Sequence, residues 1–167
     1  MPALYSMTVP VFVRFLNNFS EILKKGEAYA TAKKFEPNVL INARLAPDMF
    51  ALSRQVQIAC DVVKGGAARL SGTEVPSFPD NETTFAELQE RIAKTVKFIE
   101  GIDKGKFEGG EARNIEIKAG PRELKFDGLS YLNNFVLPNI YFHITTTYAI
   151  LRHNGVDLGK MDYLGNI

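Results

Sequence analysis

Apolar residues recur at steps of three and four along most of this chain, which is the spacing of one face of an α-helix. The first run predicts a helix that opens at Thr8, an N-capping residue followed closely by Pro10, and stops at Gly26. Its core-facing residues are Val9, Phe12, Leu16, Phe19 and Leu23. Residues 27–35 are expected to form a further helical piece.

A second run predicts a helix from about Asp48 to Leu70, since Asp48 suits the positive end of the helix dipole. Its apolar stripe is Leu52, Val56, Ala59, Val63, Ala67 and Leu70. Gly65 and Gly66 lie inside this helix, where each costs roughly 1 kcal/mol relative to alanine. Close approach of a neighbouring helix is one reason to retain them.

A loop, a third helix and a β-hairpin follow. The loop, residues 71–81, contains Pro76 and Pro79 and is long enough to cross one end of a bundle. Thr84 and Glu87 have the spacing of a capping box, in which the hydroxyl and the carboxylate each bind one orphan amide, so the third helix begins there. Polar and apolar residues then alternate over 114–118 and 123–127, which predicts a small hairpin that packs against the bundle or a partner.

The last helix begins near Ser130, is kinked or restarted at Pro138, and ends at Asn154 with Gly155 as its C-cap. Four substantial helices and one hairpin predict an all-α fold, a four-helix bundle with a small inserted β-hairpin before the last helix. The length of 167 residues fits a single domain over residues 1–167.

Composition and charge narrow the class of protein. The net charge is +1, and no basic stripe marks a nucleic-acid interface. Cys60 is the one cysteine, so no internal disulfide can form, and a buried inert thiol is favoured over a nucleophile. Neither a signal peptide nor a membrane-spanning run is recognisable. We therefore expect a soluble cytoplasmic protein with no nucleic-acid or membrane partner.

Both histidines of the chain, His143 and His153, lie in the last helix. Successive helical residues turn by about 100°, so Arg152, nine positions after His143, faces the opposite way. Arginine is rarely buried without a partner, which places Arg152 outside and His143 inside. An inward His143 is either a neutral structural histidine or a ligand or proton-transfer group in a pocket. The structural role is favoured, because no second histidine shares its face.

Other polar residues of the second helix are weaker candidates. Asp48 and Gln55 border its apolar stripe and could reach a pocket shared with His143 and Thr147, although capping alone would explain Asp48. The opposite face of the same helix, with Arg54 and Asp61 seven residues apart, is either solvated or a polar subunit interface.

Established catalytic motifs are missing from the sequence. It contains no phosphate-binding glycine loop, no paired CxxC, no HExxH and no nucleophile elbow. Two histidines cannot build a histidine-rich metal site. We therefore expect no bound metal and no cofactor.

Several stretches of the chain resemble the bacterial domain of unknown function family 1993. They are residues 44–49 (Arg-Leu-Ala-Pro-Asp-Met), 54–61 (Arg-Gln-Val-Gln-Ile-Ala-Cys-Asp), 138–143 (Pro-Asn-Ile-Tyr-Phe-His), 151–155 (Leu-Arg-His-Asn-Gly) and 162–165 (Asp-Tyr-Leu-Gly). The resemblance spans nearly the whole chain. This family is similar to the wider DinB/YfiT-like group of four-helix bundles, which implies that fold and often a homodimer, without an established activity.

In the wider group, a divalent metal is typically bound by one histidine of the second helix and two histidines, four residues apart, of the last helix. By this resemblance His143 matches the first of the last-helix pair, whereas Thr147 stands four residues later. The second helix has no histidine, and Gln55 and Asp48 are its nearest polar candidates. The metal centre therefore looks lost or heavily altered.

Two functions remain open after the sequence is read. The first is an uncharacterised bundle protein with a possible small-ligand pocket near His143 and a degenerate metal site. The second is a DinB-like metal-dependent enzyme, of thiol-transferase or hydrolase type, that uses His143 with non-histidine ligands. The count of available ligands favours the first function, and no residue is assigned a catalytic role.

Overall fold

The structure is a computed structural model that describes residues 3–166. α1 (Ala3–Lys33) is one continuous helix, so the expected opening at Thr8 and stop at Gly26 are wrong. The Thr8 hydroxyl donates to the Leu4 carbonyl 2.8 Å away and lies inside the helix. Gly26 is buried, and a methyl group there would lie 3.0 Å from Leu151 Cδ2, so this glycine permits two helices to pack closely.

A short helix, α2 (Asn38–Ile41), leads into α3 (Leu52–Ser71). Asp48 is exposed in the turn before α3, so the predicted helix start at this residue is wrong. The rest of the prediction for this helix is confirmed, since all six residues of the expected apolar stripe are buried. The glycine after the helix, Gly72, has a φ of 68° and forms a left-handed cap.

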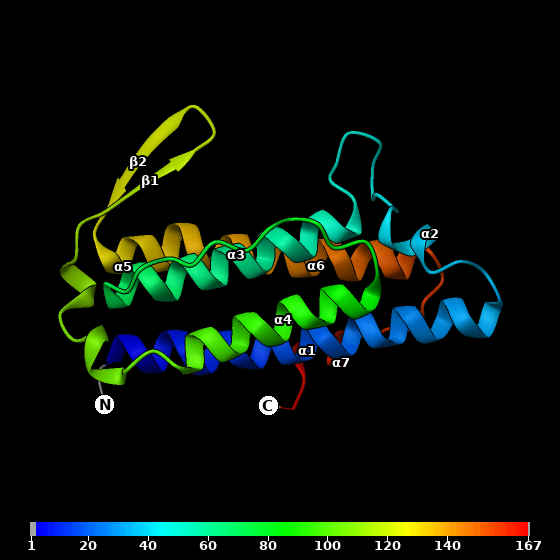
Figure 1. Ribbon diagram of the computed structural model, residues 1–167, viewed down its shortest axis with the longest axis horizontal. Helices are drawn as coiled ribbons and strands as arrows, with labels where there is room; N and C mark the ends of the chain where they lie inside the picture. Colours follow the sequence, from blue (N-terminus) through cyan, green and yellow to red (C-terminus); the bar gives the residue numbers. More distant parts are fainter. Residues whose placement is uncertain (1–2, 167) are drawn as a thin grey trace.

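α3 and α4 (Phe85–Glu100) run in the same direction, so residues 72–84, which we call the crossover, travel along the length of the bundle (Figure 1). The sequence predicted a loop long enough to cross one end of a bundle, and the structure shows that it travels the length of the bundle instead (Figure 1). Thirteen extended residues reach about 40 Å, which is enough to pass a 20-residue helix of about 30 Å. The capping box is confirmed, since Thr84 Oγ1 accepts from the Glu87 amide and Glu87 Oε2 accepts from the Thr84 amide.

Charged side chains hold the crossover against α3 and α4. Arg91 of α4 is only 3% exposed and pairs with Asp61 of α3 at 2.9 Å. It also pairs with Asp80 and Glu82 of the crossover, at 2.9 and 2.8 Å, while Arg54 of α3 forms a second ion pair with Asp80. The crossover therefore covers the Arg54–Asp61 face of α3, for which the sequence suggested solvent or another subunit.

The ring of Phe78 provides a further attachment for the crossover. The ammonium groups of Lys64 on α3 and Lys94 on α4 each lie 4.1 Å from its centroid. Lys64 is buried and pairs with Asp61 at 2.9 Å. Cations placed over an aromatic face are attracted to it, and the attraction strengthens when the cation is desolvated.

Two 3₁₀ turns, η1 (Lys104–Phe107) and η2 (Gly110–Ala112), connect α4 to the predicted hairpin of β1 (Ile115–Ala119) and β2 (Arg122–Phe126). The strands are antiparallel, and the apolar residues of both share one face because Ile115 pairs with Phe126 and Ile117 with Leu124. The hairpin stands at one end of the bundle (Figure 1).

The last helical stretch consists of α5 (Gly128–Tyr131), the π-helical turn η3 (Leu132–Val136) and α6 (Leu137–His153). The π-turn ends two residues before Pro138, whose missing amide and bulky ring interrupt the regular hydrogen-bond ladder. The backbone stays helical from Gly128 to His153, so the kink or restart predicted at Pro138 takes the form of a π-helical turn within a continuous stretch.

A final short helix, α7 (Lys160–Leu164), lies on α1. Lys25 of α1 pairs with Asp162 at 2.6 Å, and the Asn18 side chain donates to the Tyr163 carbonyl. The four long helices, α1, α3, α4 and α6, enclose the apolar core, which confirms the predicted four-helix bundle with its hairpin. Among the residues that the structure describes, no helix is both long enough and apolar enough to cross a membrane.

Gly66→Ala should destabilise the protein by about 1–2 kcal/mol, because its methyl group would lie 2.8 Å from Val136 Cγ1 and overpacking outweighs the gain in helix propensity. Gly65→Ala is the matched control, since its methyl group meets only the end of the flexible Arg69 side chain. We expect urea denaturation to show a loss for Gly66→Ala and none for Gly65→Ala. Equal effects would contradict a close approach specific to Gly66.

Candidate functional site

His143 lies on the buried face of α6 with 8% of its surface exposed, as the rotation argument predicted. Ile140 and Thr147, which are three and four positions away on the same helix, are also buried. Arg152 is exposed. The histidine therefore faces the interior of the bundle, toward α3.

Gln55 of α3 holds the His143 ring in place. Its amide nitrogen donates to the Phe50 carbonyl 3.1 Å away, which leaves its oxygen Oε1 facing His143 Nδ1 at 2.7 Å. An oxygen acceptor needs a donor, so we assign the proton of the neutral imidazole to Nδ1 on the basis of this network. Nε2 then carries a lone pair. Gln55 is 1% exposed, so the hydrogen bond is a buried link between α3 and α6.

Burial, followed by the nearby charge of Arg54, lowers the pKa of His143 from 6.5 to about 4. Both effects disfavour the imidazolium form, because a low dielectric and a like charge each raise the free energy of the added proton. His143 is therefore neutral at pH 7. In that state Nε2 can act as a hydrogen-bond acceptor, a base or a metal ligand.

The other two predicted site residues are placed differently. The Thr147 hydroxyl is fully buried and donates to the His143 carbonyl at 3.0 Å, a bond back to the preceding turn of the same helix. Asp48 lies exposed in the turn before α3. The structure thus gathers His143, Gln55 and Thr147 at the contact between α3 and α6, with Asp48 at the surface.

One exposed aromatic ring lies against the histidine, and another lies against Arg54. The Phe142 ring meets His143 edge-on with centroids 5.2 Å apart, and the Phe50 ring lies 6.0 Å from the Arg54 guanidinium. Phe50 and Phe142 are each 56% exposed. We call Phe50, Arg54, Gln55, Phe142 and His143 the histidine site, which combines a neutral acceptor, two accessible rings and one cation.

Sequence reasoning missed the phenylalanines of this site, because a phenylalanine in an apolar segment is assigned to the core by default. For Phe142 a signal existed: it is adjacent to an inward histidine and therefore turned by about 100° from it. Cys60 was assigned correctly as a buried thiol, and its burial raises its pKa to about 12.

The histidine site does not fit the divalent metal that the family resemblance implies. Gln55 Oε1 already accepts from His143, and the Thr147 hydroxyl is bound to the backbone. Within residues 3–166, no group of three or more His, Cys, Asp or Glu residues is placed to hold a metal ion. Zinc sites in proteins use three or four such ligands, so the donor set around His143 is too small for a zinc ion.

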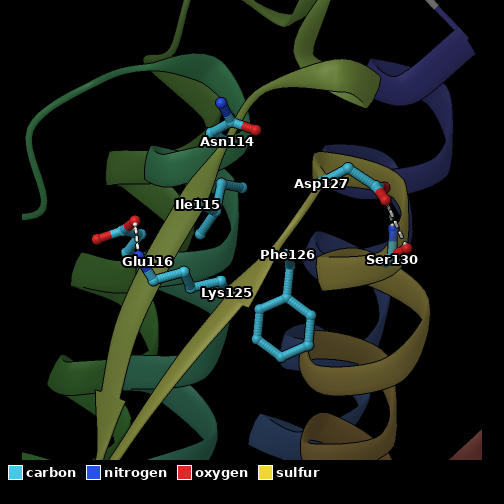
Figure 2. Close-up of a pocket in the computed structure, with 7 residues that line it drawn as sticks. All are labelled: Asn114, Ile115, Glu116, Lys125, Phe126, Asp127 and Ser130. Carbon is cyan, nitrogen blue, oxygen red and sulfur yellow. Dashed lines mark hydrogen bonds and ion pairs between the residues drawn. The ribbon is translucent and has the colours of Figure 1, made fainter.

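A cavity of about 440 Å³ lies elsewhere, at the base of the hairpin (Figure 2). The charged groups that line it serve the local structure. Glu116 pairs with Lys125 across the strands at 2.8 Å, and Asp127 caps α5 by accepting from the Ser130 amide. This cavity shares no residue with the histidine site.

The comparisons with known proteins agree with this architecture. The family described as "Domain of unknown function (DUF1993)" matches residues 4–164. Among solved structures, the chain is similar to a DinB family member protein from Shewanella denitrificans, with 46% sequence identity and a TM-score of 0.92. The match covers 98% of this chain and 93% of that chain. No curated protein matches significantly.

The free energy of unfolding should fall as the pH decreases from about 6.5 to 4. The pKa of His143 is about 4 in the folded protein but 6.5 in an unperturbed histidine, so the unfolded chain binds the additional proton throughout this window. The full effect is about 3 kcal/mol. Urea denaturation across this pH range should show that His143→Leu removes this part of the slope. His153→Leu, at the exposed histidine, should retain it, and equal slopes in the two variants would show that the His143 pKa is not depressed.

Proposed function

This chain belongs to the DUF1993 family and has a DinB-like fold, and on that premise we propose that it binds a small ligand at the histidine site without a metal ion. The observation that carries the proposal is the neutral His143 ring, whose Nδ1–H is engaged by Gln55 and whose Nε2 retains its lone pair. Small-molecule sites typically place one such polar group within an apolar frame to orient the ligand.

The ligand has a hydrogen-bond donor beside an apolar or aromatic body. The donor binds Nε2, and the accessible rings of Phe50 and Phe142 cover the body of the ligand. The Arg54 guanidinium next to Phe50 disfavours ligands with a positive charge. Phenols and small thiols meet these requirements.

A metal-dependent thiol transferase or hydrolase is the alternative that the family resemblance implies. It would need at least two ligands in addition to His143 Nε2, and Gln55 and Thr147 are already bound to other atoms of His143. The Gln55–His143 hydrogen bond directly joins the two helices from which the wider group draws its metal ligands. The donor set therefore favours the metal-independent proposal.

Nitrogen-15 NMR of the histidine rings tests the ligand proposal. Phenol should shift the His143 Nε2 signal upfield, because a lone pair that accepts a hydrogen bond becomes more shielded. Toluene, which has the same ring without the hydroxyl, should leave that signal in place. The exposed His153 is an internal control in every spectrum, and Phe50→Ser should weaken the response to phenol.

The same spectra recorded with Zn²⁺ separate the two functions. We expect no saturable shift of the Nε2 signal and no stoichiometric metal in tag-free protein. A one-to-one zinc complex that is lost in His143→Ala and kept in His153→Ala would establish the metal-dependent alternative. No response to either phenol or small thiols would overturn the small-ligand proposal.

We further propose that the protein is a cytoplasmic homodimer. α6 carries no charged residue from Leu137 to Leu151, yet Tyr141 is 38% and Phe142 56% exposed on it. An exposed apolar strip of this kind is typical of a protein–protein interface. The family resemblance supports self-association, and the lone buried thiol of Cys60 suits a reducing compartment.

Phe142→Glu should convert the dimer to a monomer, because charged residues are excluded from the core of such interfaces. Leu129→Glu on α5 is the matched control, since it adds the same charge at another exposed apolar position and should leave the dimer intact. Sedimentation velocity measures both outcomes. A monomeric wild-type protein, or equal effects of the two substitutions, would contradict an interface at α6.

A further inference from the structure

A groove of about 650 Å³ lies between the start of the crossover and the C-terminal half of α4. Its apolar wall comes from Pro76 and Phe78 of the crossover, from Phe98 of α4 and from Ile102, two residues after the end of α4. Ile102 is 6% exposed and belongs to the core, and the half-buried Phe98 packs against the core. Pro76 and Phe78 are also half-buried. The volume falls in the range of small-molecule sites.

Three lysines, Lys94, Lys97 and Lys106, line the same groove. Among the ion pairs of residues 3–166, none involves any of the three. The one acidic residue in the lining, Asp103, accepts a hydrogen bond from the Gly105 amide at 2.7 Å. Three lysines and one aspartate give the lining a charge of +2, which is more than the +1 of the entire chain.

The wall of the groove is formed before any ligand arrives. Phe78 is positioned by the Lys64 and Lys94 ammonium groups, each 4.1 Å from its ring centroid. The Lys94 charge is therefore partly engaged with the ring. Lys97 and Lys106 are exposed and have no such partner within the described residues. A preformed apolar wall beside uncompensated cations attracts molecules that are apolar on one side and anionic on the other.

We infer that this groove binds an amphipathic organic anion, whose carboxylate or sulfonate is held by Lys97 and Lys106 and whose apolar body lies against Phe98 and Ile102. The groove shares no residue with the histidine site, so this inference does not rest on the proposed function. Because the lysines are exposed, binding should weaken as the salt concentration increases.

Two fluorescent probes that differ by one charged group test the inference. 8-Anilinonaphthalene-1-sulfonate carries a sulfonate, and N-phenyl-1-naphthylamine has the same rings without it. The double substitution Lys97→Gln/Lys106→Gln should weaken binding of the sulfonate about fivefold to tenfold and leave binding of the neutral probe unchanged. Lys94 is left in place because it also positions Phe78.

A second double substitution, Lys33→Gln/Lys160→Gln, removes the same total charge from exposed positions outside the groove and should not change the affinity for either probe. Amide chemical shifts should place the sulfonate probe at Phe98 and Ile102. Equal losses of affinity in the two double variants, or shifts centred on the exposed face of α6 around Phe142, would overturn the inference.

Discussion

Two consecutive helices of this bundle, α3 and α4, run in the same direction, so the chain between them must span the bundle without secondary structure (Figure 1). Loops of this length are uncommon in compact domains and need contacts of their own to remain ordered. Arg91 meets this requirement by binding Asp80 and Glu82 of the crossover while it also binds Asp61 of α3. Burying its charge is tolerable because three carboxylates surround it, and removing such partners from a buried charge is strongly destabilising.

The fold was predictable wherever the decisive interaction is local. The capping box at Thr84 and the irregular helical turn before Pro138 depend on residues within about one helical turn, so both have a sequence signal. Thr8 and Gly26 gave wrong ends for α1, because tertiary packing overrides local helix preference and the helix extends past both residues. Gly26 lies inside the helix, where its small size allows close packing against Leu151. The course of the crossover could not be predicted, because its partners on α3 and α4 are distant in sequence.

The candidate site was predictable in part. The rotation of α6 placed His143 inside, and the position of Gln55 at the border of the α3 stripe placed it within reach. The protonation state required the structure, because it follows from the Phe50 carbonyl that orients the Gln55 amide. The sequence analysis placed the start of α3 at Asp48, but this residue lies in the turn before the helix. Aspartate before an apolar run is equally typical of a turn, so its position alone could not decide.

The crossover connects the two regions to which we assign ligands. Phe78 forms part of the lysine-lined groove, and Asp80, two residues later, pairs with Arg54 of the histidine site. Arg54 is also the charge that helps to lower the pKa of His143. The Asp80 carboxylate offsets part of that charge, so the electrostatic environment of the histidine depends on where the crossover lies. The crossover, which the parallel order of α3 and α4 requires, therefore contributes Phe78 to the wall of the lysine-lined groove. It also contributes Asp80 to the charge balance of the histidine site.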